Sequence, residues 1–152
     1  MADMARMVRR AGIGRVALHV VLPLAIGVLC YAAWRSKDIQ VVAWMSRIAP
    51  RGVDAMQGAA SSRVPSVILG SLPDAAWAWA FGASLMIVWH GRPWREKAAW
   101  LGGGATLAIA AELGQAFHVV PGTFDVADLI AIAAGFVLGA ALAGRGRATE
   151  RS

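Results

Sequence analysis

The stretch from Glu112 to Gly139 reads ELGQAFHVVPGTFDVADLIAIAAGFVLG, and it places acidic and polar side chains inside a long apolar run. Burying an ionised carboxylate at the centre of a membrane-spanning helix costs about 2.5–3.5 kcal/mol on insertion scales. Ionisable and other strongly polar residues in such segments are therefore candidates for function. In this stretch the candidates are Glu112, Gln115, His118, Asp125 and Asp128.

The composition favours a membrane protein over a soluble domain. The 152 residues are 58% hydrophobic and 16% charged, with a mean hydropathy of +0.56, whereas soluble domains are usually about 45–50% apolar and 25% charged. We therefore expect one integral membrane domain over residues 1–152. The lone cysteine, Cys30, lies in an apolar run, which excludes a disulfide framework and a cysteine-based metal site.

Four apolar segments are long enough to cross a bilayer, which takes about 17–25 residues each. They cover about 13–34, 73–90, 98–119 and 126–143. The first is too long for the apolar region of a signal peptide, which is about 7–15 residues. Between the first two lies 35–72, whose apolar face before Pro50 predicts a helix at the membrane interface. The expected fold class is all-α: a polytopic membrane protein with four transmembrane helices and an interfacial helical segment.

The chain is basic, with a formal net charge of +6. Its cationic residues flank apolar runs and form no aromatic-interleaved patch, so we interpret them as topology determinants and expect no nucleic-acid partner. They cluster before the first span, around residues 92–97 and in the C-terminal tail, and none falls in the 120–125 loop. This distribution predicts cytoplasmic N and C termini, although the external 35–72 segment also carries basic residues.

Polar side chains from different helices are expected at one level of the membrane. The second helix would begin with Asp74 and Trp77, the third would end with Glu112, Gln115 and His118, and the fourth would begin with Asp125 and Asp128. In the predicted topology these positions all lie in the outer half. A spacing of three residues turns about 60° around a helix axis, so the third-helix residues share one side. We predict an outward-facing polar cleft.

Structural roles compete with functional ones at several of these positions. Ser71-x-x-Asp74 and Asp125-x-x-Asp128 both resemble capping boxes, which satisfy the free backbone N–H groups at a helix start. His118 lies near a helix C-terminus, where the helix dipole favours it. Capping and binding therefore stay open as alternatives for the aspartates.

Glu112 has no such structural explanation. It lies about 10 Å inside the third helix at 1.5 Å per residue, and that helix carries no Lys or Arg. A partner must come from another helix, or the carboxyl group stays protonated. In an enzymatic version of the site Glu112 and Asp128 would be the catalytic acid and base, and the aspartates would offer oxygen ligands to a possible divalent cation.

Histidines in the other helices and the glycines are interpreted as structural. His19 and His90 have no acidic neighbour in sequence, which favours packing or interfacial roles. Gly135 and Gly139 form a G-x-x-x-G step that lets two helices approach closely, and the triple glycine 102–104 offers the same.

The last third of the chain resembles the VanZ-like family of small bacterial membrane proteins. The resemblance covers about 112–139 and rests on Glu112-x-x-Gln115, Gly122-Thr123-Phe124-Asp125-x-x-Asp128 and Gly135-x-x-x-Gly139. It implies a bacterial inner-membrane protein with a role in the cell envelope, akin to glycopeptide antibiotic resistance, and no particular reaction. Many members have Arg where this chain has Gly122 and Asn where it has Ile132, which weakens any anion-binding role.

Two functions follow from these observations. The first is a VanZ-like membrane protein whose outward-facing site binds or modifies an envelope precursor or a lipid head group. The second is a non-catalytic accessory or assembly subunit of a larger membrane complex, or of a homo-oligomer, because small-residue faces and the 35–72 segment suit helix packing. Catalysis is left open.

Overall fold

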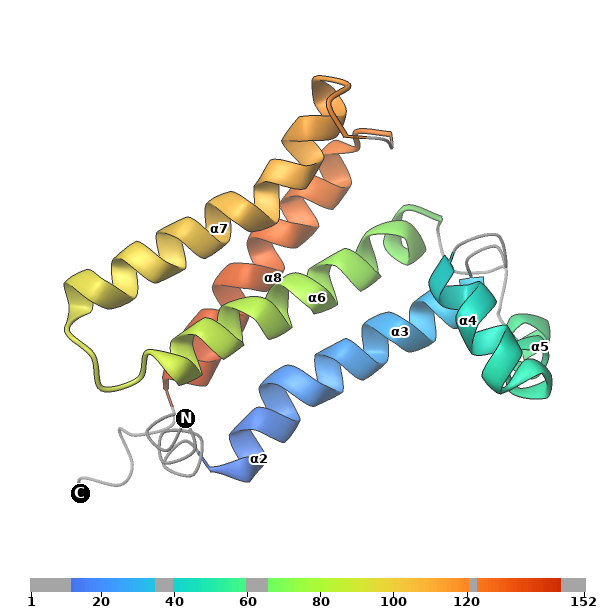
Figure 1. Ribbon diagram of the computed structural model, residues 1–152, viewed down its shortest axis with the longest axis horizontal. Helices are drawn as coiled ribbons and strands as arrows, with labels where there is room; N and C mark the ends of the chain where they lie inside the picture. Colours follow the sequence, from blue (N-terminus) through green and yellow to red (C-terminus); the bar gives the residue numbers. More distant parts are fainter. Residues whose placement is uncertain (1–11, 35–39, 60–65, 121–122, 146–152) are drawn as a thin grey trace.

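The computed structural model describes residues 12–34, 40–59, 66–120 and 123–145, and these residues form an all-α fold (Figure 1). The first helix consists of α2 (Ile13–Val16), a π-helical turn η1 (Ala17–Val21) and α3 (Leu22–Trp34). It is followed by α4 (Gln40–Ile48), α5 (Pro50–Ala59), α6 (Ser66–Val88), α7 (Trp94–Ala116) and α8 (Val126–Gly144). The predicted all-α class is confirmed.

Two helices, Ile13–Trp34 and Val126–Gly144, are long and apolar enough to cross a membrane. They coincide with the first and last expected segments. Helices α6 and α7 are also long, at 23 residues each, but they are more polar. The first turn of α7 contains Arg95, Glu96 and Lys97, and α7 ends at Ala116 instead of continuing to residue 119.

Helix α6 begins before the expected residue 73. The backbone stays helical through Pro73, although a proline supplies no N–H for the carbonyl of Leu69. Asp74 therefore lies inside α6, and the predicted Ser71-x-x-Asp74 capping box is wrong. Trp77 lies further inside the helix for the same reason.

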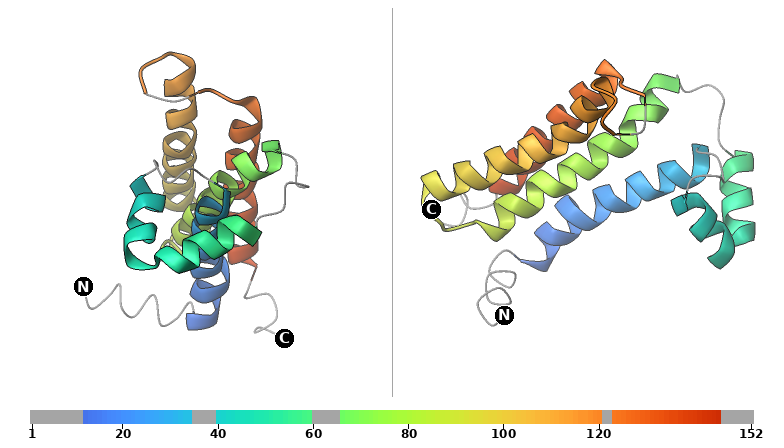
Figure 2. Two further views of the ribbon diagram at one scale, coloured as in Figure 1. Left: turned by 90° about the vertical axis from the view of Figure 1, so that its right-hand side faces the viewer. Right: turned by 45° about the horizontal axis from the view of Figure 1, so that its top comes forward.

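The described part of the segment between the first helix and α6 contains two helices, and the first corresponds to the helix expected before Pro50. Helix α4 ends at Ile48 and Pro50 opens α5, a position where the missing proline N–H is not needed. Val42 and Val53 are buried, at 0% and 2% exposure. Helices α4 and α5 contact each other and the end of α3 (Figures 1 and 2).

Helices α6 and α8 are packed backbone to backbone. A Cβ added at Gly135 would overlap the carbonyl oxygen of Ala75, and one at Gly139 would overlap that of Trp79. From the α6 side, a Cβ at Gly82 would overlap the carbonyl of Phe136. The predicted packing role of the G-x-x-x-G step is confirmed, because only glycine permits this approach.

The triple glycine of α7 packs through one member. A Cβ at Gly104 would meet Leu85 and Phe136, whereas Gly102 and Gly103 have no atom in the way within 4 Å. The packing role predicted for all three therefore holds for Gly104.

Arg15 connects the first helix to the end of α8. Its guanidinium donates a hydrogen bond to the carbonyl oxygen of Ala143, one of the carbonyls that a helix end leaves without an internal donor. A cation is also favoured there by the helix dipole. Arg15 thus has a structural role besides the predicted topological one, whereas the arginines at 6, 9 and 10 lie outside the described residues.

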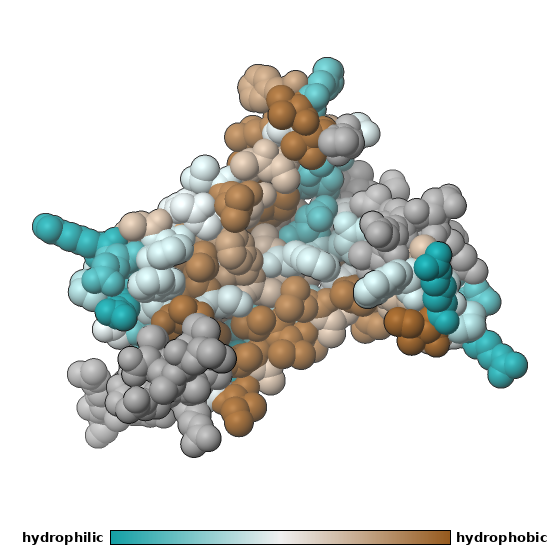
Figure 3. All heavy atoms as spheres, in the orientation of Figure 1, coloured by the Kyte–Doolittle hydropathy of each residue, from teal (hydrophilic) through white to brown (hydrophobic). Residues whose placement is uncertain are grey.

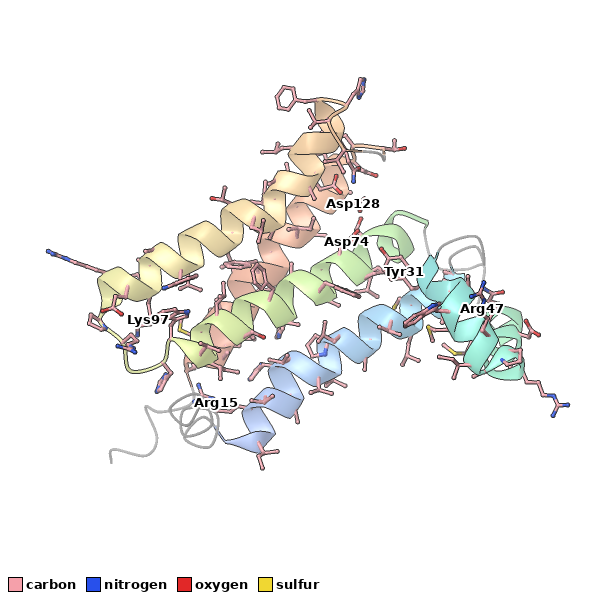
Figure 4. The ribbon with its side chains drawn as sticks, in the orientation of Figure 1. Arg15, Tyr31, Arg47, Asp74, Lys97 and Asp128 are labelled. Atoms are coloured by element: carbon pink, nitrogen blue, oxygen red, sulfur yellow. The ribbon has the colours of Figure 1, made fainter. Side chains whose placement is uncertain are left out.

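Apolar side chains cover the outside of the helices. On the first helix and on α8 many of them are between 40% and 63% exposed, including Leu18, Val21, Leu22, Ile26, Leu29, Val126, Ile130, Val137 and Leu138. On the side of the molecule that Figure 3 shows, apolar surface lies across the middle and hydrophilic surface lies at the left and right ends. Figure 4 places Lys97 and Arg47 at these ends. Large exposed apolar areas are unusual on soluble monomers and typical of a lipid-facing surface.

Candidate functional site

A pocket of about 510 Å³ opens between α3, α6, α7 and α8. Its polar and aromatic lining is Tyr31 from α3, Asp74, Trp77 and Phe81 from α6, and Glu112 and Gln115 from α7. The remaining wall is aliphatic and includes Ile132 of α8. The structure thus brings together Asp74, Trp77, Glu112 and Gln115 from the predicted set.

Among the polar residues that line this pocket, Glu112 is the most buried. It is only 7% exposed, and its Oε2 atom is buried without a hydrogen-bond partner in the part of the chain that the structure describes. An unsatisfied buried polar atom costs about 1–3 kcal/mol, and more when it is charged. No Lys or Arg is among the described residues that line the pocket. A ligand that supplies a hydrogen-bond donor would satisfy this oxygen.

The other polar lining residues lie around Glu112. Gln115 follows one turn later on α7, so both side chains share one face of that helix. Tyr31 and Asp74 both line the pocket, and Figure 4 shows them where the end of α3 faces the first half of α6. Both already have interaction partners within the protein. The unpartnered oxygen of Glu112 is therefore the polar atom of the pocket to which a ligand would most clearly supply a hydrogen-bond partner.

Sequence reasoning did not identify Tyr31. It is the sole tyrosine of the chain and lies in an apolar run one turn before Trp34. A tyrosine in such a place is typical of an interfacial residue, so its position opposite Asp74 follows only from the packing of α3 against α6. The only signal for Tyr31 in the sequence was that the chain contains no other tyrosine.

Asp125 caps α8 and does not line the pocket. Its Oδ1 accepts a hydrogen bond of 2.8 Å from the backbone N–H of Ala127, and the side chain is exposed. This is the bond that an N-cap aspartate makes with the second residue of a helix. The capping alternative is confirmed for this residue.

Asp128 links α8 to α6. Its Oδ1 accepts a hydrogen bond of 2.5 Å from the hydroxyl of Ser71, which is 8% exposed. Ser71 lies one turn before Asp74, and Figure 4 shows Asp74 and Asp128 at the same end of the molecule. Asp128 lies outside the pocket lining, and its observed contact is structural.

His118 forms the end of α7. It has a positive φ of 57°, while its N–H donates to the carbonyl of Gln115 and the N–H of Val119 donates to Gly114. These two bonds define a Schellman motif, in which the left-handed position is usually glycine. His118 is exposed, does not line the pocket, and ends the helix before the expected residue 119.

The aspartates Asp125 and Asp128, considered as cation ligands, make other contacts in the structure. Glu112 lines the pocket. No group of three or more His, Cys, Asp or Glu side chains within the described ranges is arranged to hold a metal ion.

No family model, curated protein or solved structure matches the chain. The VanZ-like motif noted in the sequence therefore stays a prediction. Of the two departures from that motif, Ile132 lines the pocket, and Gly122 lies outside the described residues.

Proposed function

We propose that this chain is a VanZ-like protein of the bacterial inner membrane whose pocket binds the polar head group of a lipid or envelope precursor. The observation that carries the proposal is the buried, unpartnered Oε2 of Glu112 in a pocket between helices. Natural proteins rarely leave such an atom without a partner. A bound head group would supply that partner.

In this proposal α6 and α7 cross the membrane beside the two apolar helices. Each has 23 residues, which is long enough for a bilayer. Their interior acidic side chains, Asp74 and Glu112, face the pocket and so are shielded from hydrocarbon. Arg15 and Lys97 lie toward one end of the molecule and Arg47 at the other (Figure 4). If the termini are cytoplasmic, the end that carries Arg15 and Lys97 is the cytoplasmic end. In this topology the pocket lies in the outer half of the membrane, near Trp34 and Ala116.

The pocket favours a ligand with a positive charge or with several hydrogen-bond donors. Glu112 and Asp74 are acceptors when ionised, and Trp77 and Phe81 add aromatic rings to the lining, a residue type whose ring faces attract ammonium groups. A charge-assisted hydrogen bond to a buried carboxylate is worth about 1.5–3 kcal/mol. A bare phosphate would find no cation among the described lining residues. We therefore favour an amine-bearing head group, such as that of phosphatidylethanolamine.

The proposed activity is binding, and Glu112 is the residue that would extend it to proton transfer. A buried carboxyl group within hydrogen-bond reach of a bound amine or hydroxyl can act as a general acid or base. Asp128 is engaged with Ser71, so the catalytic pair expected from the sequence reduces to Glu112 in this proposal.

The test measures the affinity of the full chain in detergent for three lipids, phosphatidylethanolamine, phosphatidylglycerol and phosphatidic acid, by native mass spectrometry. We expect phosphatidylethanolamine to bind most tightly. Glu112→Gln should weaken that binding about tenfold or more, because one charge-assisted hydrogen bond is lost.

Glu96→Gln is the matched control, since Glu96 is an exposed glutamate of the same helix. It should leave the affinity unchanged. Equal binding of phosphatidylethanolamine by the wild type and Glu112→Gln would contradict the proposed function.

A second candidate is the accessory subunit, and one observation favours it. The exposed side of α7 combines Gly102 and Gly103, which have open space beside them, with the exposed Leu107. Small residues next to a large apolar one suit close packing by another membrane helix. A chain of 15.9 kDa that runs as a monomer after mild detergent extraction would argue against this alternative.

A further inference from the structure

A second cavity, of about 590 Å³, lies on the opposite face of α6, between the first helix, α6 and α8. We call it the acyl groove. Its wall is aliphatic except at two residues, His19 of the first helix and Trp79 of α6. The α8 side is made of three small residues and one leucine, Ala131, Ala134, Gly135 and Leu138. The groove is therefore a slot between helices with nearly no polar surface.

The two exceptions carry unsatisfied nitrogens. Nδ1 of His19 and Nε1 of Trp79 are both buried, and neither has a hydrogen-bond partner in the part of the chain that the structure describes. The two rings are stacked, with centroids 6.4 Å apart and planes inclined by 16°. An indole N–H is a donor only, so the group that satisfies Trp79 must be an acceptor.

The backbone around His19 is also irregular. His19 lies in the π-helical turn η1, after which the N–H of Leu22 donates to the carbonyl of Ala17, five residues earlier. Such turns are rare and are found frequently at functional sites. The irregular turn and the two residues that carry the unsatisfied nitrogens coincide at one place on the groove wall.

The polar pair marks one end of the groove. The first helix and α6 run in opposite directions (Figures 1 and 2), so His19 and Trp79 lie toward Ile13, while Ile26 and Leu72 line the other end. A ligand that fits has an uncharged acceptor at one end and an unbranched hydrocarbon chain that extends from it. A charged group would meet no counter-ion among the described lining residues, and burying it unpaired is costly.

We propose that the acyl groove holds one fatty acyl chain of a glycerolipid, with the ester carbonyl oxygen accepting a hydrogen bond from Nε1 of Trp79. The inference rests on the membrane location proposed above and is independent of the Glu112 pocket. In the predicted topology the polar pair lies toward the cytoplasmic side, so the lipid belongs to the inner leaflet. Its chain runs from His19 and Trp79 toward Ile26 and Leu72.

The test compares two photoreactive lipids that differ in one atom group. Full-length protein is reconstituted in vesicles of phosphatidylethanolamine and phosphatidylglycerol with a trace of phosphatidylcholine carrying a diazirine in one chain. That chain is attached by an ester in one probe and by an ether, which lacks the carbonyl, in the other. Cross-linked peptides are identified by mass spectrometry. We expect labelling at 18–26, 72–79 and 131–138, about three- to tenfold stronger with the ester probe, the factor that one neutral hydrogen bond provides.

Trp79→Phe removes the N–H and keeps an aromatic ring. It should lower labelling by the ester probe to the level of the ether probe. Trp100→Phe is the control, because Trp100 is exposed and stacks on Trp89, outside the groove. Ala134→Leu should fill the slot and abolish labelling by both probes.

Equal labelling by the two probes in the wild type would overturn the inference, as would labelling that avoids the groove. Because Ala134→Leu could disturb the packing of α8, the comparison of probes in Trp79→Phe stands on its own. A chain that does not float with the vesicles would overturn the membrane location and this inference together. A chain that floats and binds phosphatidylethanolamine through Glu112, yet shows no labelling in the groove, would overturn only this inference.

Discussion

The two faces of α6 differ in the kind of polar atom that they leave unsatisfied. On one face Glu112 offers a buried acceptor in a pocket with a second carboxylate and aromatic rings. On the other face Trp79 offers a buried donor in a nearly apolar groove. In the two proposals each face binds a complementary group, a cationic head group in the first case and a carbonyl-bearing chain in the second. One helix thus separates two different environments because its neighbours differ on its two faces.

The largest effect is expected where α6 packs against α8, because these two helices form part of the wall of both sites. Gly139→Leu would force a side chain into the carbonyl of Trp79, and overpacking of this kind costs about 1–3 kcal/mol or more. We expect a marked loss of thermal stability in detergent, with loss of both lipid binding and groove labelling.

Gly103→Leu is the matched control for that substitution. Gly103 has open space beside it on α7, so the same added side chain should leave both sites intact. If Gly139→Leu impaired one face and spared the other, the two sites would not share the wall that the packing implies.

The hydrogen bond between Ser71 and Asp128 joins the same two helices beside the pocket. Ser71→Ala leaves the carboxylate of Asp128 without its donor, which should cost about 1–3 kcal/mol of stability. Lipid binding by the Glu112 pocket should change little at temperatures where the variant is folded. A loss of binding without a loss of stability would instead assign Asp128 to the site, as the sequence predicted.

Fold elements were predictable where an apolar run has clear ends. The segments expected at 13–34 and 126–143 agree with the helices to within a residue, because charged or capping residues stand beside them. The start of α6 was not predictable by the same rule, since Pro73 is typical of a helix start and here lies inside a helix. The end of α7 was missed because His118, and not glycine, occupies the left-handed position.

The candidate site was predictable in part. Asp74, Glu112 and Gln115 stood out because each is a polar residue in an apolar segment, and the structure brings them to one pocket. The partner of Asp128 lies 57 residues away in sequence, and His19 and Trp79 are single residues without a local pattern. Such pairs arise only when helices pack, so no local reading of the sequence finds them.

A smaller effect is expected at Arg15, and it should differ between the groove and the pocket. Arg15→Gln removes the cation from the carbonyl of Ala143, which should cost about 0.3–1 kcal/mol from the dipole interaction. Because this contact ties the first helix to α8 near His19, labelling of the groove should fall more than lipid binding at the pocket. Thermal unfolding and photolabelling of the same preparation measure both, and equal losses at the two sites would contradict this assignment.

The smallest effect is expected at His118. The change in stability, compared with the change in binding, distinguishes a residue that only ends α7 from one that contacts the ligand. A non-glycine residue in the left-handed conformation is strained by about 1–2 kcal/mol, and glycine adopts it freely. Since glycine also loses more entropy on folding, His118→Gly should raise the stability by about 1 kcal/mol or less. Binding of phosphatidylethanolamine should not change, because His118 is exposed and outside the pocket. Weaker binding by a more stable variant would return His118 to the site, since a residue that only terminates α7 has no contact with the ligand to lose.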